Sequence, residues 1–228
     1  MKIIKSINRL NKDVNFKANI GFVPTMGSLH KGHLSLIESA KNNCDKTLVS
    51  IFINPSQFNK KSDYKKYPRN LTKDLTILKN MKIDYVFLPN INDVYKNKKE
   101  MKLKIASKDK VLCAKYRKGH FEGVLAVINQ FLKYIKAKYM FLGEKDYQQI
   151  YLIKKLIKVK FNTKIIICKT IRLNNSLAYS SRNYLLQKKE VDKASKISKK
   201  LKYFYSSLKI DFKNIKNLNK IKKEILKY

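Results

Sequence analysis

Two histidines three positions apart are the first candidates for chemistry in this chain. His30 and His33 lie in the run PTMGSLHKGH, residues 24–33, between an apolar segment and a helical pattern. A turn of this kind presents unpaired backbone N–H groups and the positive end of a helix dipole, which suit a phosphate. Imidazoles can donate to phosphate oxygens, and Gly32 lets a nucleotide approach the backbone closely. Ordinary turn histidines are the alternative, but the position after a strand favours phosphate binding.

Two more polar segments directly follow apolar runs. Residues 50–58 read SIFINPSQF and residues 143–149 read GEKDYQQ, and both include glutamine. Because parallel strands end at the same edge of a sheet, we expect these segments to lie near the histidines.

The elements that must position these residues alternate along the chain. Apolar runs predict strands over residues 18–25, 47–53, 85–88, 139–142 and 163–168. Helical spacing predicts helices over residues 32–40, 71–81, 121–135 and 148–157. This alternation predicts an α/β class protein, a Rossmann-like open parallel sheet with helices on both faces. After residue 170 it stops, so we expect a first domain of residues 1–170 and a small, mainly helical C-terminal domain of residues 171–228.

Composition excludes several classes of protein. The 228 residues are 44% hydrophobic, so the chain is not disordered throughout. Cys44, Cys113 and Cys168 form no close pair, which argues against a disulfide framework or a zinc cage. No apolar stretch approaches the roughly 20 residues that cross a bilayer, so we expect a cytoplasmic protein without membrane partners.

The charge of the chain is strongly positive. Lys and Arg number 52 against 16 acidic residues, a net charge of +36, which by itself suggests nucleic acid. Only five of these residues are arginine, and the lysines are spread along the chain. Abundant Lys, Asn, Ile and Tyr are typical of an AT-rich genome, so we interpret the charge as a compositional bias and expect no nucleic-acid partner.

The pattern formed by His30, Gly32 and His33 resembles the HxGH signature of the adenylyl-transferring superfamily that includes class I aminoacyl-tRNA synthetases and small nucleotidylyltransferases. Those enzymes add a loop with serine and a basic residue that closes on the triphosphate. Ser180, Ser181 and Arg182 match such a loop. The same residues suit the N-cap of the last helix equally well.

Four segments in order are similar to the pantoate-beta-alanine ligase family, over roughly residues 18–185. They are residues 24–33, 50–58, 119–124 (GHFEGV) and 143–149. The resemblance implies a ligase that condenses pantoate with beta-alanine, consuming ATP, in the biosynthesis of pantothenate and coenzyme A. It also implies a pantoyl-adenylate intermediate and the release of AMP and pyrophosphate.

The resemblance assigns the ATP site residue by residue. His33 is the expected proton donor, and His30, Lys145 and Arg182 are expected to act with it on the phosphates. The residues expected to contact ATP are Met26, Gly27, Ser28, Leu29, His30, Lys31, Gly32, His33, Gly143, Glu144, Lys145, Asp146, Ile171, Tyr179, Ser180, Ser181 and Arg182. A place in the core is an equal alternative for Ile171, and we expect Tyr179 to contact adenine through its backbone.

The remaining assignments concern the acid, the amine, the metal and the oligomer. Gln57 and Gln149 match the glutamines that hold pantoate, and Gln57 also borders the beta-alanine position. Mg²⁺ should accompany ATP, because it prefers phosphate oxygens to a protein cage. Asp74 is a candidate metal ligand, and a solvated helix residue is the alternative. The family implies a homodimer, with His120 in a segment that we interpret as structural.

The chain departs from the family in its C-terminal domain. In most members this domain is longer and is expected to act as a lid over ATP. A reduced lid predicts weaker ATP binding or hydrolysis of the adenylate, so that AMP exceeds pantothenate. Lys31 also stands where an acid is common.

The sequence alone leaves two other functions open. A nucleotidylyltransferase of the same superfamily predicts no release of AMP and no need for Gln57 and Gln149. A nucleic-acid-binding module predicts binding that falls steeply with salt.

Overall fold

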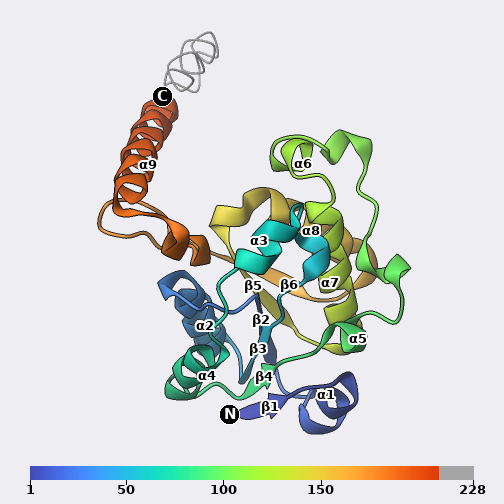
Figure 1. Ribbon diagram of the computed structural model, residues 1–228. Helices are drawn as coiled ribbons and strands as arrows, with labels where there is room; N and C mark the ends of the chain where they lie inside the picture. The colour runs from blue at the N-terminus through green and yellow to red at the C-terminus, as the bar shows by residue number, and fades with distance from the viewer. Residues whose placement is uncertain (211–228) are drawn as a thin grey trace. The chain divides into compact units, whose positions relative to one another are not determined.

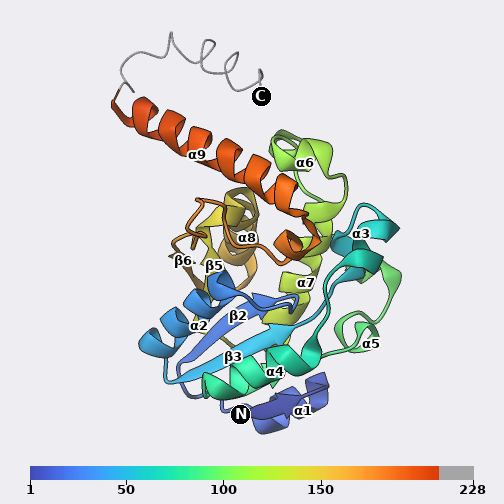
Figure 2. The ribbon, with the colours of Figure 1, turned by 60° about the vertical axis from the view of Figure 1, so that its left-hand side comes forward.

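A six-stranded parallel sheet forms the centre of the first part of the chain (Figure 1, Figure 2). The computed structural model describes residues 1–210, with side chains as far as Ser206. The strands are β1 (Lys2–Ile4), β2 (Ile20–Thr25), β3 (Lys46–Ile51), β4 (Tyr85–Phe87), β5 (Tyr139–Gly143) and β6 (Lys164–Cys168). Their order is β1-β4-β3-β2-β5-β6, and every neighbouring pair is parallel. The predicted open Rossmann-like sheet is confirmed.

Helices connect the strands. The α-helices are α1 (Ile7–Asp13), α2 (Lys31–Asn43), α3 (Lys61–Lys66), α4 (Leu71–Asn80), α5 (Ile91–Val94), α6 (Cys113–Tyr116), α7 (His120–Tyr134), α8 (Tyr147–Lys160) and α9 (Lys188–Ile210). Short 3₁₀ helices are η1 (Pro55–Gln57), η2 (Lys98–Met101), η3 (Ser107–Asp109), η4 (Glu144–Asp146) and η5 (Ser181–Leu185). No helix in the described part of the chain is both long and apolar enough to cross a lipid bilayer.

Side chains of the strands alternate between two buried layers. Phe22, Leu48 and Met140 belong to one apolar cluster, which also contains side chains of α1, α7 and α8. Val23 and Phe141 belong to the other, which contains side chains of α2 and α4. Period-two alternation with both faces buried is what a sheet between two helical layers requires. Figure 2 shows α2 and α4 on the opposite side of the sheet from α7.

The carboxyl ends of the strands meet at one edge. In register, Thr25 of β2 lies beside Ile51 of β3, and Leu142 of β5 lies beside Ile167 of β6. The segments that follow β2, β3 and β5 therefore start from neighbouring positions, as the sequence predicted. This is the edge where open parallel sheets bind ligands.

Two details differ from the prediction. β1 and α1 were not expected, because Lys2–Ile4 is a short edge strand with only Ile4 buried. β3 ends at Ile51 rather than Ile53, although the backbone N–H of Phe52 still donates to the Thr25 carbonyl.

Contacts divide the chain into two compact units, residues 1–170 and the residues from 171 onward. In the second unit Arg172 and Ala178 form an antiparallel bridge, followed by η5 and α9. The helix predicted to continue to Tyr228 lies outside the described residues beyond Ile210. A lid role for this unit remains a prediction.

Candidate active site

The turn after β2 is held by side chains at its start. The Thr25 hydroxyl donates to the Ser50 carbonyl at 2.7 Å and accepts from the Gly27 N–H at 3.1 Å. Gly27 and Ser28 both have a positive φ, 74° and 50°. Glycine adopts this backbone readily, but serine does so at a cost, so other contacts must fix Ser28.

His30 and His33 lie side by side at the start of α2. Their rings are stacked, with centroids 4.0 Å apart. His30 is the N-cap residue of α2, and its Nδ1 accepts from the Gly32 N–H at 3.1 Å. A neutral His30 ring therefore carries its proton on Nε2. The structure brings together the two histidines that the sequence singled out.

Both imidazoles are neutral at ordinary pH. Burial, and after it the charge of Lys145, lowers the pKa of His30 to about 4. Burial, followed by the charges of His30 and Lys145, lowers the pKa of His33 to about 3. Nδ1 of His33 is buried and has no hydrogen-bond partner among the described residues, so nothing stabilises a proton there.

Lys145 comes to this pair from a distant part of the sequence. It lies in η4, directly after β5, and its side chain is exposed. It follows β5, which pairs with β2 in the sheet, and its charge lowers the pKa of both histidines. Glu144 and Asp146 flank it and are also exposed. Lys145 thus adds positive charge to the two N–H-bearing rings, an arrangement suited to a polyphosphate.

Gln57 is held in place by a buried asparagine. Asn54 is completely buried, and its Nδ2 donates to Gln57 Oε1 at 3.2 Å and to the Gly123 carbonyl at 3.0 Å. Its Oδ1 accepts from the Tyr95 hydroxyl at 3.1 Å. The Gln57 amide nitrogen donates to Met26 Sδ at 3.1 Å, which links the β3 segment to the β2 turn.

Helix α7 supports the same segment from behind. His120 Nδ1 lies 2.7 Å from the Gln57 carbonyl oxygen, to which it donates. A Cβ on Gly123 would lie 2.5 Å from the Ser56 carbonyl oxygen, so only glycine permits this close approach of helix and turn. These contacts give His120 the structural role expected from the sequence.

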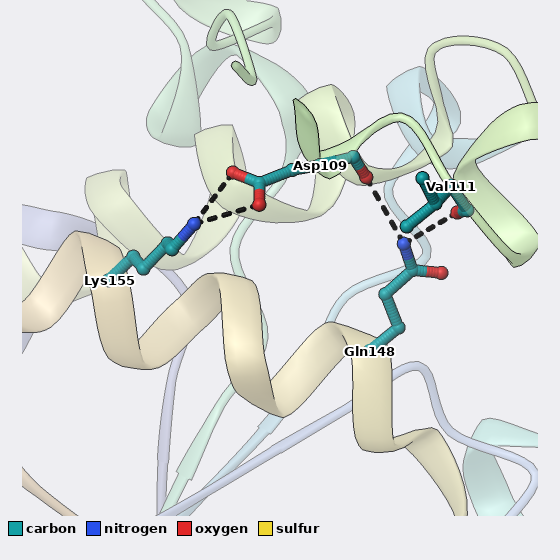
Figure 3. Close-up of polar contacts among 4 residues, drawn as sticks. All are labelled: Asp109, Val111, Gln148 and Lys155. Carbon is teal, nitrogen blue, oxygen red and sulfur yellow. Dashed lines mark hydrogen bonds and ion pairs between the residues drawn. The ribbon is translucent and has the colours of Figure 1, made fainter. Parts of the chain in front are cut away.

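The start of α8 carries two glutamines with different surroundings. Gln149, the expected pantoate residue, is partly exposed in the first turn. Gln148 is bound to the segment before α7: its Nε2 donates to the carbonyls of Asp109 and Val111 at 3.2 and 2.7 Å (Figure 3). Lys155, on the same helix, donates to both carboxylate oxygens of Asp109 at 2.8 Å (Figure 3).

Asp74 has contacts that do not favour the predicted metal site. Its side chain is only 2% exposed, and its two oxygens accept from the backbone N–H groups of Ser28 and Leu29, both at 2.8 Å. Residues 1–210 contain no group of three or more His, Cys, Asp and Glu side chains placed to hold a metal ion. The alternative of a solvated helix residue is wrong, because Asp74 is buried.

The remaining ATP candidates belong to the second unit. Ser180 is the N-cap of η5, and its hydroxyl accepts from the Arg182 N–H at 3.3 Å. It therefore caps a short 3₁₀ helix and not the last helix, α9. Ser181 is buried, whereas Ile171 and Tyr179 are partly buried and joined by a bond from the Tyr179 N–H to the Ile171 carbonyl. Their roles at ATP remain predictions.

Sequence reasoning missed three residues that shape the site. Asn54 was interpreted only as the end of a strand, Asp74 as a metal ligand, and Gln148 was not distinguished from Gln149. An Asn-Pro pair after a strand signals a capping turn, and Asn54 indeed accepts from the Ser56 N–H. The partners of Asp74 and Gln148 lie more than 30 residues away, so no local pattern could reveal them.

The chain is similar to known proteins over most of its length. The family described as pantoate-beta-alanine ligase matches residues 2–227. A pantothenate synthetase of Francisella tularensis subsp. novicida is 43% identical over 224 residues, covering 96% of this chain and 82% of the relative.

Solved structures agree as well. A Francisella tularensis pantoate-beta-alanine ligase complexed with beta-gamma ATP and beta-alanine has a TM-score of 0.83 and 41% identity, over 87% of this chain and 78% of that one. A pantothenate synthetase from Thermus thermophilus has a TM-score of 0.83 and 30% identity, over 87% and 72%. Because sequence and fold agree over most of both chains, this chain belongs to the pantoate-beta-alanine ligase family and is a ligase.

Proposed function

We propose that this chain condenses pantoate with beta-alanine, consuming ATP, to form pantothenate. The observation that carries the proposal is the meeting of three segments at one sheet edge: the stacked pair His30 and His33, the amide of Gln57 and the ammonium of Lys145. Family membership supports it, and so does the relative whose complex holds beta-gamma ATP and beta-alanine.

The phosphates of ATP are proposed to bind at the start of α2. The phosphates can accept hydrogen bonds from the Nε2–H of His30 and from the ring of His33. The ammonium of Lys145 adds a positive charge. The helix dipole adds to this positive end. From the second unit we propose Ser180, Ser181 and Arg182 as further phosphate contacts, with Ile171 and Tyr179 at the nucleoside.

The acid and the amine are proposed to bind beside Gln57 and Gln149. Asn54 and Met26 hold the Gln57 side chain, so its amide is oriented before a substrate arrives. A preorganised amide loses little side-chain entropy on binding, which favours recognition of a small hydroxy acid. Gln149 would supply the second amide from the first turn of α8.

The reaction is proposed to take two steps. A pantoate carboxylate oxygen attacks the α-phosphorus of ATP, and pyrophosphate leaves with the electrons of the broken P–O bond. The beta-alanine amine then attacks the acyl carbon of pantoyl-adenylate, loses a proton, and AMP leaves. His33 is proposed as the proton donor near the phosphates, where positioning and charge neutralisation lower the barrier.

Magnesium is proposed to arrive as part of MgATP. Mg²⁺ is held mainly by phosphate oxygens and water with one or two carboxylates. Because phosphate oxygens and water supply most of its ligands, no protein cage is needed for it. Asp74 is not proposed as a ligand, because its side chain is only 2% exposed and each of its oxygens already accepts from a backbone N–H group.

We further propose a homodimer, on the strength of family membership. Large apolar side chains around α6 are exposed on the first unit, Leu112 by 67% and Tyr116 by 80%, which suits a subunit contact. Light scattering on the purified protein tests this: a mass of one chain at micromolar concentration would contradict it.

One assay tests the proposed function. The protein is incubated with MgATP, pantoate and beta-alanine, and each component is omitted in turn. We expect both AMP and pantothenate, with AMP in excess as the reduced lid predicts, and pyrophosphate release that needs pantoate but not beta-alanine. A one-to-one ratio of AMP to pantothenate would show that the adenylate does not leak. A nucleotidylyltransferase would release no AMP, and that result would overturn the proposal.

A further inference from the structure

The buried carboxylate of Asp74 binds the turn that precedes the two histidines. Asp74 lies in the first turn of α4, and its two oxygens accept separately from Ser28 N and Leu29 N at 2.8 Å. The donor and acceptor residues are 46 and 45 positions apart. Hydrogen bonds from N–H groups to a charged carboxylate are stronger than neutral ones. Asp74 is thus a direct link between α4 and the candidate nucleotide segment.

The turn needs such a link because of its backbone. Ser28 has a φ of 50°, which is unfavourable for a residue with a Cβ. The preceding Gly27 has a φ of 74°, and a Cβ there would lie 2.8 Å from Asp74 Oδ2. Glycine at 27 and aspartate at 74 are therefore required together for this conformation.

Packing does not fix the turn on all sides. An open cavity of about 730 Å³ is lined by Met26, Gly27 and Ser28, with Asp74 also in its wall. None of the histidines lines it, and neither does Gln57. On this side no packed neighbour holds the turn, and the two carboxylate bonds restrain Ser28 and Leu29 directly.

We infer that Asp74 is a positioning residue for ATP: its carboxylate fixes Ser28 and Leu29, and thereby sets where His30 caps α2 and where His33 points. The amides of Ser28 and Leu29 donate to protein and not to phosphate, so the phosphates are bound by the side chains and amides that follow. This inference rests on the proposed function, because it assumes that the segment binds ATP.

Asparagine at position 74 is the discriminating substitution. Asp74→Asn keeps the size of the side chain but turns an NH₂ group toward one of the two N–H groups, so one bond is lost. A suitable control is Asp84→Asn. Asp84 accepts from the Thr47 N–H at 2.9 Å and pairs with Lys46 at 2.8 Å, and Thr47 lies at the amino end of β3, away from the candidate site.

We expect Asp74→Asn to raise the Kd for ATP about tenfold or more, which corresponds to losing one charge-assisted bond. Binding is measured by calorimetry with MgATP, and Asp84→Asn should keep the wild-type Kd although its stability falls too. The Mg²⁺ concentration needed for half-maximal rate should not change in Asp74→Asn. A selective rise in that concentration would mean that Asp74 is a metal ligand, and an unchanged Kd for ATP would mean that it does not position the segment.

A measurement on the wild-type chain covers the case in which Asp74→Asn fails to fold. Amide hydrogen exchange at Ser28 and Leu29 should be slow without ATP and unchanged by ATP, because the carboxylate already occupies both N–H groups. Slow exchange that appears only with ATP would overturn the inference. Failure of the wild-type chain to bind ATP at all would instead overturn the proposed function.

Discussion

The two histidines of the candidate site lack charge in the free chain, and this determines what they can do. Their pKa values, about 4 and about 3, leave both rings neutral at pH 7. A neutral imidazole still donates one hydrogen bond, so the pair can bind phosphate without the desolvation penalty of two buried cations. The negative charge of a polyphosphate would raise both pKa values, so that His33 can take up a proton and then act as an acid.

Replacement of His33 tests its proposed role. We expect His33→Ala to slow pantoate-dependent pyrophosphate release by about 10²- to 10³-fold, the range for a lost acid or a lost charge-stabilising donor. His33→Gln, which keeps an N–H donor but cannot titrate, should lose less. Stopped-flow detection of pyrophosphate in the absence of beta-alanine isolates this step. A wild-type rate in His33→Ala would contradict the assignment.

The same pKa values predict how stability depends on pH. Each histidine has an ordinary pKa of 6.5 when unfolded and a lower one when folded, so between pH 6.5 and about 4 the unfolded chain binds more protons. Stability is therefore lost as the pH falls through this window, by about 1–2 kcal/mol per imidazole at pH 5.

Urea unfolding from pH 7 to pH 4.5 measures this loss. In the double variant His30→Asn with His33→Asn, the loss of stability over this pH range should be smaller than in the wild type. Equal pH dependence in the two proteins would show that the rings are not neutral in the folded chain.

At the scale of the elements, the sequence predicted the strands and helices that show a clear local pattern of apolar residues. β2, β3 and β5 follow from continuous apolar runs, because both of their faces are buried, and α7 follows from a complete helical stripe. β6 was also predicted from an apolar run, although it is an edge strand with partly exposed residues. β1 could not be predicted, since Lys2 and Ile3 are exposed and three residues show no period.

In the candidate site, too, some residues could be predicted from the sequence and others could not. His30 and His33 were found because they follow a strand and precede a helix. Gln57 and Lys145 were found because the segments after two other strands resemble the ligase family. The supports of these residues, Asn54 among them, act through contacts between residues far apart in sequence, such as the bond from Asn54 to the Gly123 carbonyl across 69 positions. Patterns in a single sequence carry no information about such pairs.

Gly123 gives a prediction about two packed elements. In Gly123→Ala the new methyl group would meet the backbone of Ser56 and Gln57 at 2.5 to 2.7 Å, so η1 must move. We expect a loss of about 1–3 kcal/mol in stability and a raised KM for pantoate. Gly143→Ala, whose Cβ would meet nothing within 4 Å, is the control for stability. Equal melting temperatures of the two variants would show that η1 can move away from the new methyl group without loss of stability.

Gln148 gives a second prediction at this scale. Besides its two donor bonds, its Oε1 accepts from the Ala114 N–H at 3.3 Å, so one side chain fixes three points of residues 109–114. In Gln148→Ala we expect exchange of the Ala114 amide to be about tenfold faster, which equals about 1.4 kcal/mol of local stability. Exchange mass spectrometry measures it, with the exposed Lys154→Ala as control. Equal exchange rates in both variants would mean that residues 109–114 keep their conformation without the Gln148 side chain.

At the scale of the whole molecule, charge is the most prominent property. With a net charge of +36, the chain will attract any polyanion at low salt. We expect its binding to duplex DNA, followed by fluorescence anisotropy, to weaken steeply between about 50 and 200 mM salt and to be weaker than micromolar at the upper limit. Micromolar binding that persists there would favour a nucleic-acid role beside the ligase activity.

The order of the strands also has a consequence for synthesis on the ribosome. β2 occupies the middle of the sheet, yet its partner on one side, β5, begins at Tyr139, long after β2 ends at Thr25. While the intervening residues emerge, the nascent chain has β3 on one flank of β2 and an uncovered row of peptide groups on the other. During translation this incomplete sheet is therefore expected to bind chaperones. Lys145 follows β5, so it can join His30 and His33 only after more than half of the polypeptide has been made.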